Sequence, residues 1–197
     1  MSFLLGLTGS IGMGKSTTAE MFAQEGCAVW DADAAVHRLY AKGGAAVEPV
    51  ASVFPEAIEE GAVSRMRLKE IIARDPAALS IIESIVHPRV AQDREAFIEA
   101  SANAIIVLDI PLLFENGFEK KVDAVACVTV SPEVQKQRVL KRGTMTEEQF
   151  KGILSRQMPN EDKAARADFV IETDTLEHAR AQVHDIVEQV KSRLANA

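Results

Sequence analysis

Cysteine and aromatic residues are scarce in this sequence of 197 residues, and its 22 Lys and Arg are outnumbered by 29 Asp and Glu. Its two cysteines, Cys27 and Cys127, lie far apart, lack the spacing of metal ligands and neighbour apolar residues. Free cysteine behaves as a small hydrophobic residue, so we interpret both as core residues rather than as a disulfide or a metal site. A chain without a disulfide framework suits a reducing compartment, and we expect a cytoplasmic protein.

The sequence also lacks a long apolar run. Its first segment, MSFLLGLTGS, has no basic region and reaches a glycine after five residues, which indicates neither a signal peptide nor a membrane span. The formal net charge is −7, and broad nucleic-acid binding needs a positive field. We therefore expect no membrane, no nucleic acid and no obligate protein partner, and an anionic ligand must meet a local basic cluster.

Short apolar runs recur along the chain and alternate with helical stretches. Five of them are predicted to be buried strands: Phe3–Leu7, Ala28–Trp30, Ile105–Leu108, Ala124–Val130 and Phe169–Ile171. This alternation predicts an α/β fold, with a parallel sheet of about five strands and helices on both faces.

The connection between the second and third predicted strands is about 75 residues long, far more than one crossover helix needs. Apolar residues recur there at helical spacing, and little of it resembles a strand. We therefore predict a single domain with a core of residues 1–47 and 104–197 and a helical substrate lobe of residues 48–103.

The first predicted strand runs into a glycine-rich loop. Gly9–Ser16 has the sequence GSIGMGKS, which matches the phosphate-loop pattern G-x-x-x-x-G-K-[ST]. Glycines let the backbone turn its N–H groups toward phosphate, as does the amino end of the helix that follows. Lys15 would meet the β- and γ-phosphates and Ser16 would bind Mg²⁺. The alternative is a chance glycine-rich turn, against which the strand before and the predicted helix after the loop argue.

Asp31 and Asp33 directly follow the second predicted strand. Chemistry in α/β sheets gathers at the carboxyl ends of strands, and an acceptor hydroxyl needs a carboxylate to orient it and take its proton. We predict Asp33 as the base because it lies farther past the strand end. Asp31 either caps the helix predicted at Ala34–Tyr40 or has a direct role beside Asp33.

Asp109 ends the third predicted strand. It resembles the aspartate that orients magnesium-bound water in many phosphate-loop enzymes. A loop carboxylate that accepts backbone hydrogen bonds explains the position equally well, and both interpretations stay open.

A basic cluster occupies the last third of the chain. Ser131 and Pro132 predict a helix start, Gly143 a helix end, and Thr146 a capping box that opens another helix. The basic residues are Arg138, Lys141, Arg142, Lys151, Arg156, Lys163 and Arg166. Two short basic helices joined by a glycine loop indicate a lid over residues 138–166 that closes on phosphates. Interspersed acidic residues allow the alternative of a solvated face.

His87 precedes Pro88 at the point where the apolar helical pattern of the lobe ends. A residue before proline is disfavoured in helices, so His87 is either a helix-boundary residue or a ligand contact. The other histidines are interpreted as surface or packing residues.

Taken together, these residues resemble the dephospho-CoA kinase family over nearly the whole chain. The likeness comprises LTGSIGMGKST at Leu7–Thr17, Asp31-Ala-Asp33, IVHPRV at Ile85–Val90, DIPLLFENG at Asp109–Gly117, SPEVQKQRVLKR at Ser131–Arg142, and Ala167-Asp168. Many kinases share the first segment, whereas the middle ones are more particular to this family. Ser10 and Met13 depart from the usual residues, but both are variable positions of the loop pattern.

The resemblance implies that ATP phosphorylates the ribose 3′-hydroxyl of dephospho-CoA, in the last step of CoA synthesis. It implies a P-loop kinase core, a helical substrate lobe and a lid. It also assigns residues. ATP would be held by Gly12, Met13, Gly14, Lys15, Ser16 and Thr17, with Arg138 and Arg142 in the lid or near the nucleotide. The catalytic aspartate would lie in Asp31-Ala-Asp33, and the substrate side would include His87, Leu112 and Glu115. The resemblance does not require Asp109.

Two other functions fit the phosphate loop alone. A kinase for a nucleoside or a sugar acid shares the loop, but the segments around His87 and Leu112 weigh against it. A GTP-dependent switch or a non-catalytic nucleotide-binding module is the second, and the chain has neither an N-K-x-D nor a D-x-x-G motif.

Overall fold

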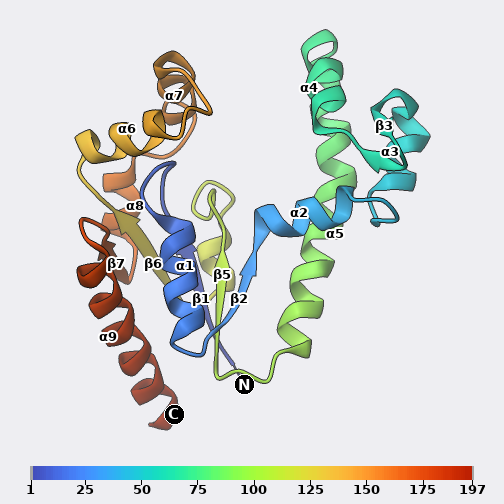
Figure 1. Cartoon of the computed structure of the whole chain (residues 1–197). Coiled ribbons are helices and arrows are strands. Elements are labelled where there is room, and N and C mark those ends of the chain that lie inside the picture. The colour runs from blue at the N-terminus through green and yellow to red at the C-terminus, as the bar shows by residue number, and fades with distance from the viewer. Residues whose placement is uncertain (1, 197) are drawn as a thin grey trace. The chain divides into compact units, whose positions relative to one another are not determined.

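The computed structural model describes residues 2–196, which divide into two compact units. Unit 1 contains the chain up to Trp30 and from Ser101 onward, and unit 2 contains residues 31–100. We describe each unit by itself. Figure 1 shows the elements of both.

Unit 1 is built on a five-stranded sheet with the order β2-β5-β1-β6-β7. The strands are β1 (Phe3–Thr8), β2 (Ala28–Asp31), β5 (Ile105–Asp109), β6 (Ala124–Thr129) and β7 (Phe169–Glu172). β1 pairs in parallel with β5 and β6, and β6 pairs in parallel with β7. All five predicted strands are confirmed, and so is the α/β fold; the continuous apolar runs of β5 and β6 form strands that are buried on both faces, whereas the edge strand β7 is partly exposed.

Helices cover one face of this sheet. They are α1 (Lys15–Gln24) and α9 (Leu176–Ala195), which pack against each other. The core beneath them includes Leu5, Leu7 and Phe22, each with no exposed surface, together with the apolar face of α9. Side chains alternate along a strand, so Leu5 and Leu7 point toward the same face.

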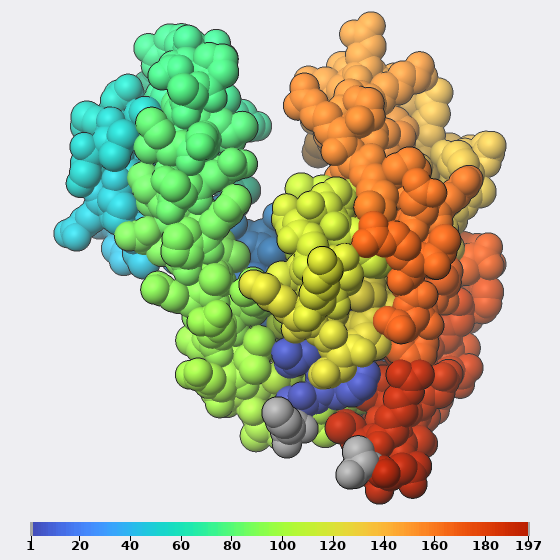
Figure 2. Space-filling model, turned by 180° about the vertical axis from the view of Figure 1, so that it is seen from behind, coloured from blue at the N-terminus to red at the C-terminus, as the bar shows by residue number. Residues whose placement is uncertain are grey.

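The opposite face of the sheet carries the segment after β5. Gly6 of β1 faces Leu113 and Val122 from this segment, which also contains the short helix η2 (Phe118–Lys121). Seen from behind in Figure 2, the segment is yellow and lies beside the orange residues of α8 (Asn160–Arg166), which packs against β6.

The predicted helix starts after β6 are confirmed. Ser131 Oγ accepts a hydrogen bond from the Val134 N–H at the start of α6 (Pro132–Lys141). Thr146 and Gln149 form a reciprocal capping box at the start of α7 (Glu147–Leu154). These caps satisfy backbone N–H groups that have no partner inside the helix, which sets where each helix begins.

Unit 2 is mostly helical and has its own core. Its helices are α2 (Ala32–Tyr40), α3 (Val47–Val53), η1 (Pro55–Ala57), α4 (Arg65–Arg74) and α5 (Ala77–Ala100). The core joins Val50, Leu68, Ile71 and Ile82, as the helical spacing of the apolar residues predicts. α2 packs on α5 and contributes Leu39 to this core, so unit 2 begins at Asp31, earlier than residue 48 where the lobe was expected to start.

Two features of unit 2 differ from the prediction. A hairpin of β3 (Ile58–Glu59) and β4 (Ala62–Val63) was missed because its strands are two residues each. Glu60 and Gly61, at its turn, both have positive φ values of 51° and 82°, which matches a two-residue hairpin turn.

The second difference lies at Pro88. A helix boundary at His87 was wrong, since α5 continues through Pro88 to Ala100. Proline removes one helical hydrogen bond and distorts the helix. The Arg89 side chain stabilises this region, because Nη1 donates to Ile85 O at 2.6 Å and Nε donates to Ala45 O at 2.8 Å.

We expect both cysteines to be unreactive in the folded protein. Cys27 and Cys127 are buried and unpaired by disulfides, and burial raises the pKa of each thiol to about 11. At pH 8 only about one thiol in a thousand is then ionised, and the thiolate is the reactive form. Titration with dithiobis-nitrobenzoate at pH 8 should therefore detect almost no thiol in native protein and two per chain in guanidinium chloride. Rapid native labelling would contradict the core assignment.

Candidate active site

The glycine-rich loop connects β1 to α1 in unit 1, as its sequence pattern predicts. Gly12 and Gly14 have φ values of +81° and +94°, which residues with a Cβ rarely adopt. A Cβ on Gly12 would lie 2.5 Å from Val139 Cγ2, so packing and backbone conformation both require glycine there. α1 begins at Lys15, and its exposed first turn presents Ser16 and Thr17. The loop and the amino end of α1 together form an anion-binding arrangement.

Lys15 forms an ion pair with Asp109, the last residue of β5. Asp109 is 1% exposed and the Lys15 side chain is 16% exposed. The pair brings together two strand ends that lie next to each other in the sheet, because β1 and β5 are neighbours. The sequence suggested two interpretations of Asp109. The observed contact adds a third, in which Asp109 holds the lysine of the phosphate loop.

Three side chains that sequence reasoning missed hold the backbone of the loop. Asn160 Oδ1 accepts from Ser10 N at 2.9 Å, Gln135 Nε2 donates to Ile11 O at 2.7 Å, and Thr173 Oγ1 donates to Met13 O at 2.7 Å. They come from α8, from α6 and from the turn after β7. Each of these side chains lies more than 120 residues from its partner in the loop, so no local sequence pattern predicts the contact. The one available signal was weak, namely a polar residue at a position that packs inward.

The two predicted arginines of α6 have different surroundings. Arg138 is half-buried, and its guanidinium donates to Thr173 Oγ1 at 2.9 Å and to Thr173 O at 2.5 Å. Arg142 is exposed at the carboxyl end of the helix. Arg138 is therefore attached to the residue that holds Met13, whereas Arg142 projects from the surface of unit 1.

A buried ion pair joins the segment after β5 to α8. Lys163 has no exposed side-chain surface, and its Nζ lies 2.8 Å from Glu115 Oε1 and 3.2 Å from Pro111 O. Glu115 Oε1 also accepts from Met158 N at 2.9 Å. Burial alone would raise the pKa of the Glu115 carboxyl, but hydrogen bonds from Lys163 and from backbone N–H groups hold it below its ordinary value. Leu112, by contrast, is 39% exposed.

The remaining predicted residues lie in unit 2. Asp31 Oδ1 accepts from Ala34 N at 2.9 Å and caps α2, which confirms the capping alternative. Asp33 is exposed in the first turn of the same helix, and His87 is exposed on α5. Among the basic residues of the lobe, Arg67 pairs with Glu59 and Glu70.

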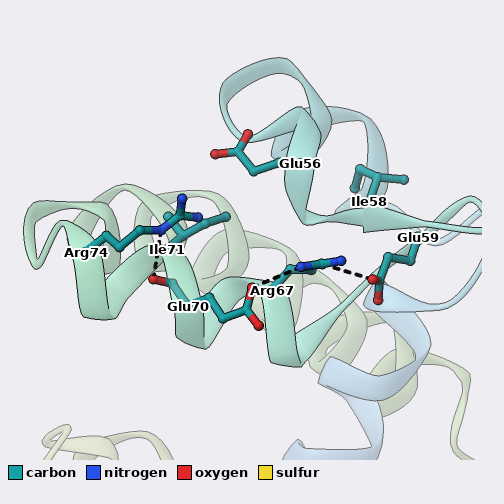
Figure 3. Close-up of a pocket in the computed structure, with 7 residues that line it drawn as sticks. All are labelled: Glu56, Ile58, Glu59, Arg67, Glu70, Ile71 and Arg74. Atoms are coloured by element: carbon teal, nitrogen blue, oxygen red, sulfur yellow. Dashed lines mark hydrogen bonds and ion pairs between the residues drawn. The ribbon is translucent and has the colours of Figure 1, made fainter.

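Arg67 also lines a cavity of about 390 Å³ in unit 2 (Figure 3). Figure 3 shows its guanidinium between the carboxylates of Glu59 and Glu70, and Arg74 Nε donates to Glu70 O at 3.3 Å. Arg67 therefore pairs with two of the carboxylates of the wall, and we assign this cavity no ligand.

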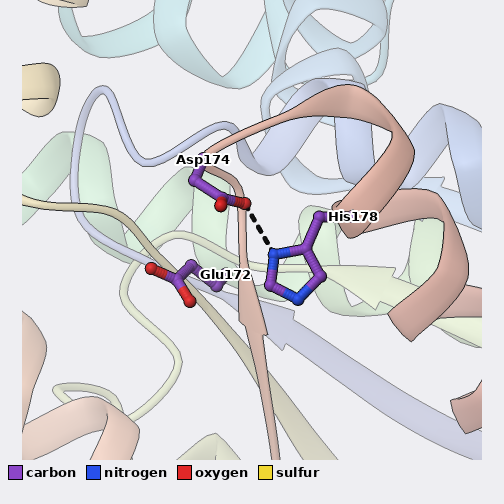
Figure 4. Close-up of side chains that lie close together, drawn as sticks. All are labelled: Glu172, Asp174 and His178. Atoms are coloured by element: carbon purple, nitrogen blue, oxygen red, sulfur yellow. Dashed lines mark hydrogen bonds and ion pairs between the residues drawn. The ribbon is translucent and has the colours of Figure 1, made fainter.

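A second cluster lies at the end of β7 (Figure 4). Glu172, Asp174 and His178 place three possible ligand atoms within 4.8 Å of one another, and all three residues are exposed. His178 Nδ1 lies 2.7 Å from Asp174 Oδ1, and this hydrogen bond lowers the pKa of the Asp174 carboxyl. An ordinary surface pair accounts for the arrangement, so we assign no metal to it.

Replacing Glu115 should destabilise unit 1 in a pH-dependent way. Glu115→Gln leaves the buried Lys163 ammonium without its counter-charge, and we expect a loss of up to about 3 kcal/mol at pH 7. Because the folded-state pKa of Glu115 is lowered, the carboxylate contributes stability above its ordinary value of 4.5 and loses it as pH falls through the folded value. The free energies of unfolding of wild type and variant, measured in urea, should therefore converge as pH falls below 4.5.

Glu188→Gln is the matched control for this variant. Glu188 pairs with Lys191 at 2.8 Å on the exposed surface of α9, where an ion pair contributes little. Equal effects of the two substitutions at pH 7, or a Glu115→Gln deficit that persists undiminished at pH 3, would contradict the assigned role of the buried pair.

No helix among residues 2–196 is both long and apolar enough to cross a membrane.

Comparison with known proteins identifies the family. Residues 3–178 match the family model described as dephospho-CoA kinase. The dephospho-CoA kinase of Ruegeria pomeroyi is 65% identical over 192 residues, which cover 98% of both chains. That of Cereibacter sphaeroides is 58% identical over 189 residues, 96% of both chains.

Solved structures agree in fold. The crystal structure of TT1252 from Thermus thermophilus has a TM-score of 0.84 and 31% identity, covering 95% of this chain and 97% of that one. A dephospho-CoA kinase from Campylobacter jejuni, 24% identical and with a TM-score of 0.69, covers 96% of this chain and 98% of its own. The chain belongs to the dephospho-CoA kinase family, and its activity is the phosphorylation of dephospho-CoA in the final step of coenzyme A biosynthesis.

Proposed function

We propose that this chain transfers the γ-phosphoryl group of ATP to the 3′-hydroxyl of the ribose of dephospho-CoA, giving CoA and ADP. The binding of the phosphoryl donor is supported by the loop between β1 and α1. Its Lys15, the first residue of α1, pairs with the buried carboxylate of Asp109, and the first turn of the helix is exposed. The acceptor half rests on membership of the family. Phosphoryl transfer depends mainly on positioning and on electrostatic stabilisation, and the residues of the loop supply both.

The donor phosphates would be held by the segment of residues 12–17, through Lys15 and the backbone N–H groups other than that of Met13, which donates to Ser10 O at 3.2 Å. Asp109 supports this role, since a buried carboxylate keeps the lysine ammonium at the end of β5 before the nucleotide arrives. On binding, the phosphates present a larger negative charge, and Lys15 would neutralise their β and γ oxygens.

Mg²⁺ would be held through the Ser16 hydroxyl. Ser16 is exposed in the first turn of α1, and oxygen atoms of hydroxyls, phosphates and water are the ligands that Mg²⁺ prefers, so the residues present fit the ion. When bound, the ion neutralises charge on the β- and γ-phosphates.

Asp33 would orient the ribose hydroxyl and take its proton. Two observations in unit 2 support this choice over Asp31. The Asp31 carboxylate accepts a hydrogen bond from the Ala34 N–H and caps α2. Asp33, the second residue of that helix, is exposed. Asp31 would then position Asp33 by fixing the first turn of α2, which is an orienting role in catalysis.

The substrate side would include His87, Leu112 and Glu115, with Glu115 acting while it is paired to Lys163. The lid would span residues 138–166. Its two ends are attached to unit 1, through Arg138 on Thr173 and through the buried Lys163, so the part that closes would be the stretch between them that contains α7. The two buried thiols support a reducing, cytoplasmic location.

Asp33→Asn should lower kcat by about 10²- to 10⁴-fold, the usual contribution of a general base. Nucleotide affinity should stay near that of wild type, because the substitution removes no group from the phosphate loop. Asp31→Asn is the matched control, since asparagine caps helices as well as aspartate does and the turn is preserved. Steady-state kinetics and ATP titration of both variants test this. If Asp31→Asn were the inactive one, the base would be Asp31.

Arg142→Ala should lower kcat/KM by about 10²- to 10³-fold, as expected when one charged donor to the transferring group is removed. The neighbouring Lys141→Ala is the matched control, because Lys141 is equally exposed at the end of α6. If kcat/KM stayed unchanged in both variants, Arg142 would be an ordinary solvent-exposed residue with no role in phosphoryl transfer.

The function itself is tested by an acceptor panel with the full chain. ADP release from ATP and Mg²⁺ should require dephospho-CoA, and the product should carry its new phosphate on the ribose 3′-oxygen by ³¹P NMR. Turnover with a nucleoside or with shikimate in place of dephospho-CoA would overturn the proposal. So would acceptor-independent binding of GTP and ATP with equal affinity and no turnover.

A further inference from the structure

We propose that Gln135 and Thr173 are positioning residues that set the direction of the phosphate-binding N–H groups of Gly12 and Gly14. The inference rests on the phosphate-loop role proposed above and extends it to residues that lie 120 or more positions away in the sequence. Neither side chain needs to touch the nucleotide. Each acts through the backbone of the loop.

The argument begins with the geometry of the peptide bond. In a trans peptide, the C=O of one residue and the N–H of the next point in opposite directions. The peptides after Ile11 and Met13 are trans. Gln135 Nε2 donates to Ile11 O at 2.7 Å, so the Gly12 N–H points away from Gln135. Thr173 Oγ1 donates to Met13 O at 2.7 Å, so the Gly14 N–H points away from Thr173.

Both donors are built into the protein rather than resting on its surface. Gln135 is 5% exposed and Thr173 is 7% exposed. The Thr173–Met13 hydrogen bond is buried and the Gln135–Ile11 hydrogen bond is partly buried, so a carbonyl that loses either donor incurs a desolvation cost, and a rotated peptide that finds another partner is favoured. The rotation would turn an N–H group away from the phosphate.

The loop is also packed directly on these two residues. A Cβ on Gly12 would lie 3.1 Å from the Gln135 carbonyl oxygen, and one on Gly14 would lie 3.0 Å from Thr173 Oγ1. The glycines therefore bring the loop close enough for the two hydrogen bonds to form. The phosphate loop therefore packs directly against Gln135 and Thr173.

Arg138 determines which way the Thr173 hydroxyl points. A guanidinium only donates, so Thr173 Oγ1 must accept from Arg138 and direct its own proton to an acceptor. Two acceptors are in reach, Met13 O at 2.7 Å and Thr129 O at 3.3 Å, and the shorter bond goes to the loop. Arg138 thus acts on the phosphate loop through Thr173.

Asn160 completes the arrangement on the other side of the loop. Its Oδ1 accepts from Ser10 N at 2.9 Å, and its Nδ2 donates to Val128 O at 3.1 Å. This hydrogen bond occupies the Ser10 N–H, so Asn160 fixes where the part of the loop that binds phosphate begins.

The test compares Thr173→Val, which keeps the shape and removes the hydroxyl, with Thr173→Ser, which keeps the hydroxyl. Calorimetric titration measures binding of ATP and of AMP to the full chain without an acceptor. We expect ATP binding about 10- to 100-fold weaker in Thr173→Val, near-normal binding in Thr173→Ser, and AMP binding unchanged in both. AMP lacks the β- and γ-phosphates, so it reports effects that do not involve the loop.

Gln135→Met provides a second test on a different element, should Thr173→Val unfold. It keeps the length of the side chain and removes the donor, and it should likewise weaken ATP and spare AMP. Wild-type ATP affinity in a folded variant with a lowered melting temperature would overturn the proposal, as would equal losses for ATP and AMP. These outcomes are distinct from failure of the proposed function, in which wild-type protein itself would show no ATP binding or no turnover of dephospho-CoA.

Discussion

A backbone loop that offers its N–H groups to a ligand has to place its carbonyl groups elsewhere, and this constraint organises unit 1. The carbonyls of Ile11 and Met13 point outward to side chains of α6 and of the turn after β7. The sheet brings these partners to the loop, because β6 pairs with β1 and β7 pairs with β6. The phosphate loop therefore depends on elements that follow it by more than a hundred residues, and it forms as part of the whole unit.

The chain carries a net charge of −7, yet its ligands are polyanions. Two internal ion pairs fix where two of its lysines lie. Lys15 lies on the buried Asp109, and the fully buried Lys163 lies on Glu115. Buried ammonium groups need a partner because an unpaired charge inside the protein is expensive. One pair holds a cation ready at the phosphate loop, while the other attaches α8 to the segment that follows β5.

The sequence predicted most of the fold because its central strands β5 and β6 are buried on both faces and therefore have continuous apolar runs. Helix starts at Ser131 and Thr146 were also predictable, since caps are local interactions. The hairpin at Ile58–Val63 was too short to show a period, and of the two interpretations of His87 before Pro88 the helix boundary is wrong, because α5 continues through it. The hairpin left no signal to read, whereas at Pro88 a local signal is offset by the Arg89 side chain, which contacts both Ile85 O and the distant Ala45 O.

The candidate site divides in the same way. The sequence alone determined the chemistry: Gly12, Gly14, Lys15 and Ser16 form a phosphate-binding pattern, and the segments around Asp33, His87 and Leu112 resemble one family. The cap of α2 by Asp31 is a local contact, whereas the arginine attached to Thr173 and the residue paired with Lys15 were decided by tertiary structure. The physical reason is range. A loop pattern and a helix cap are encoded within a few residues, whereas the partner of a buried charge or carbonyl is whatever side chain the packed sheet brings to it.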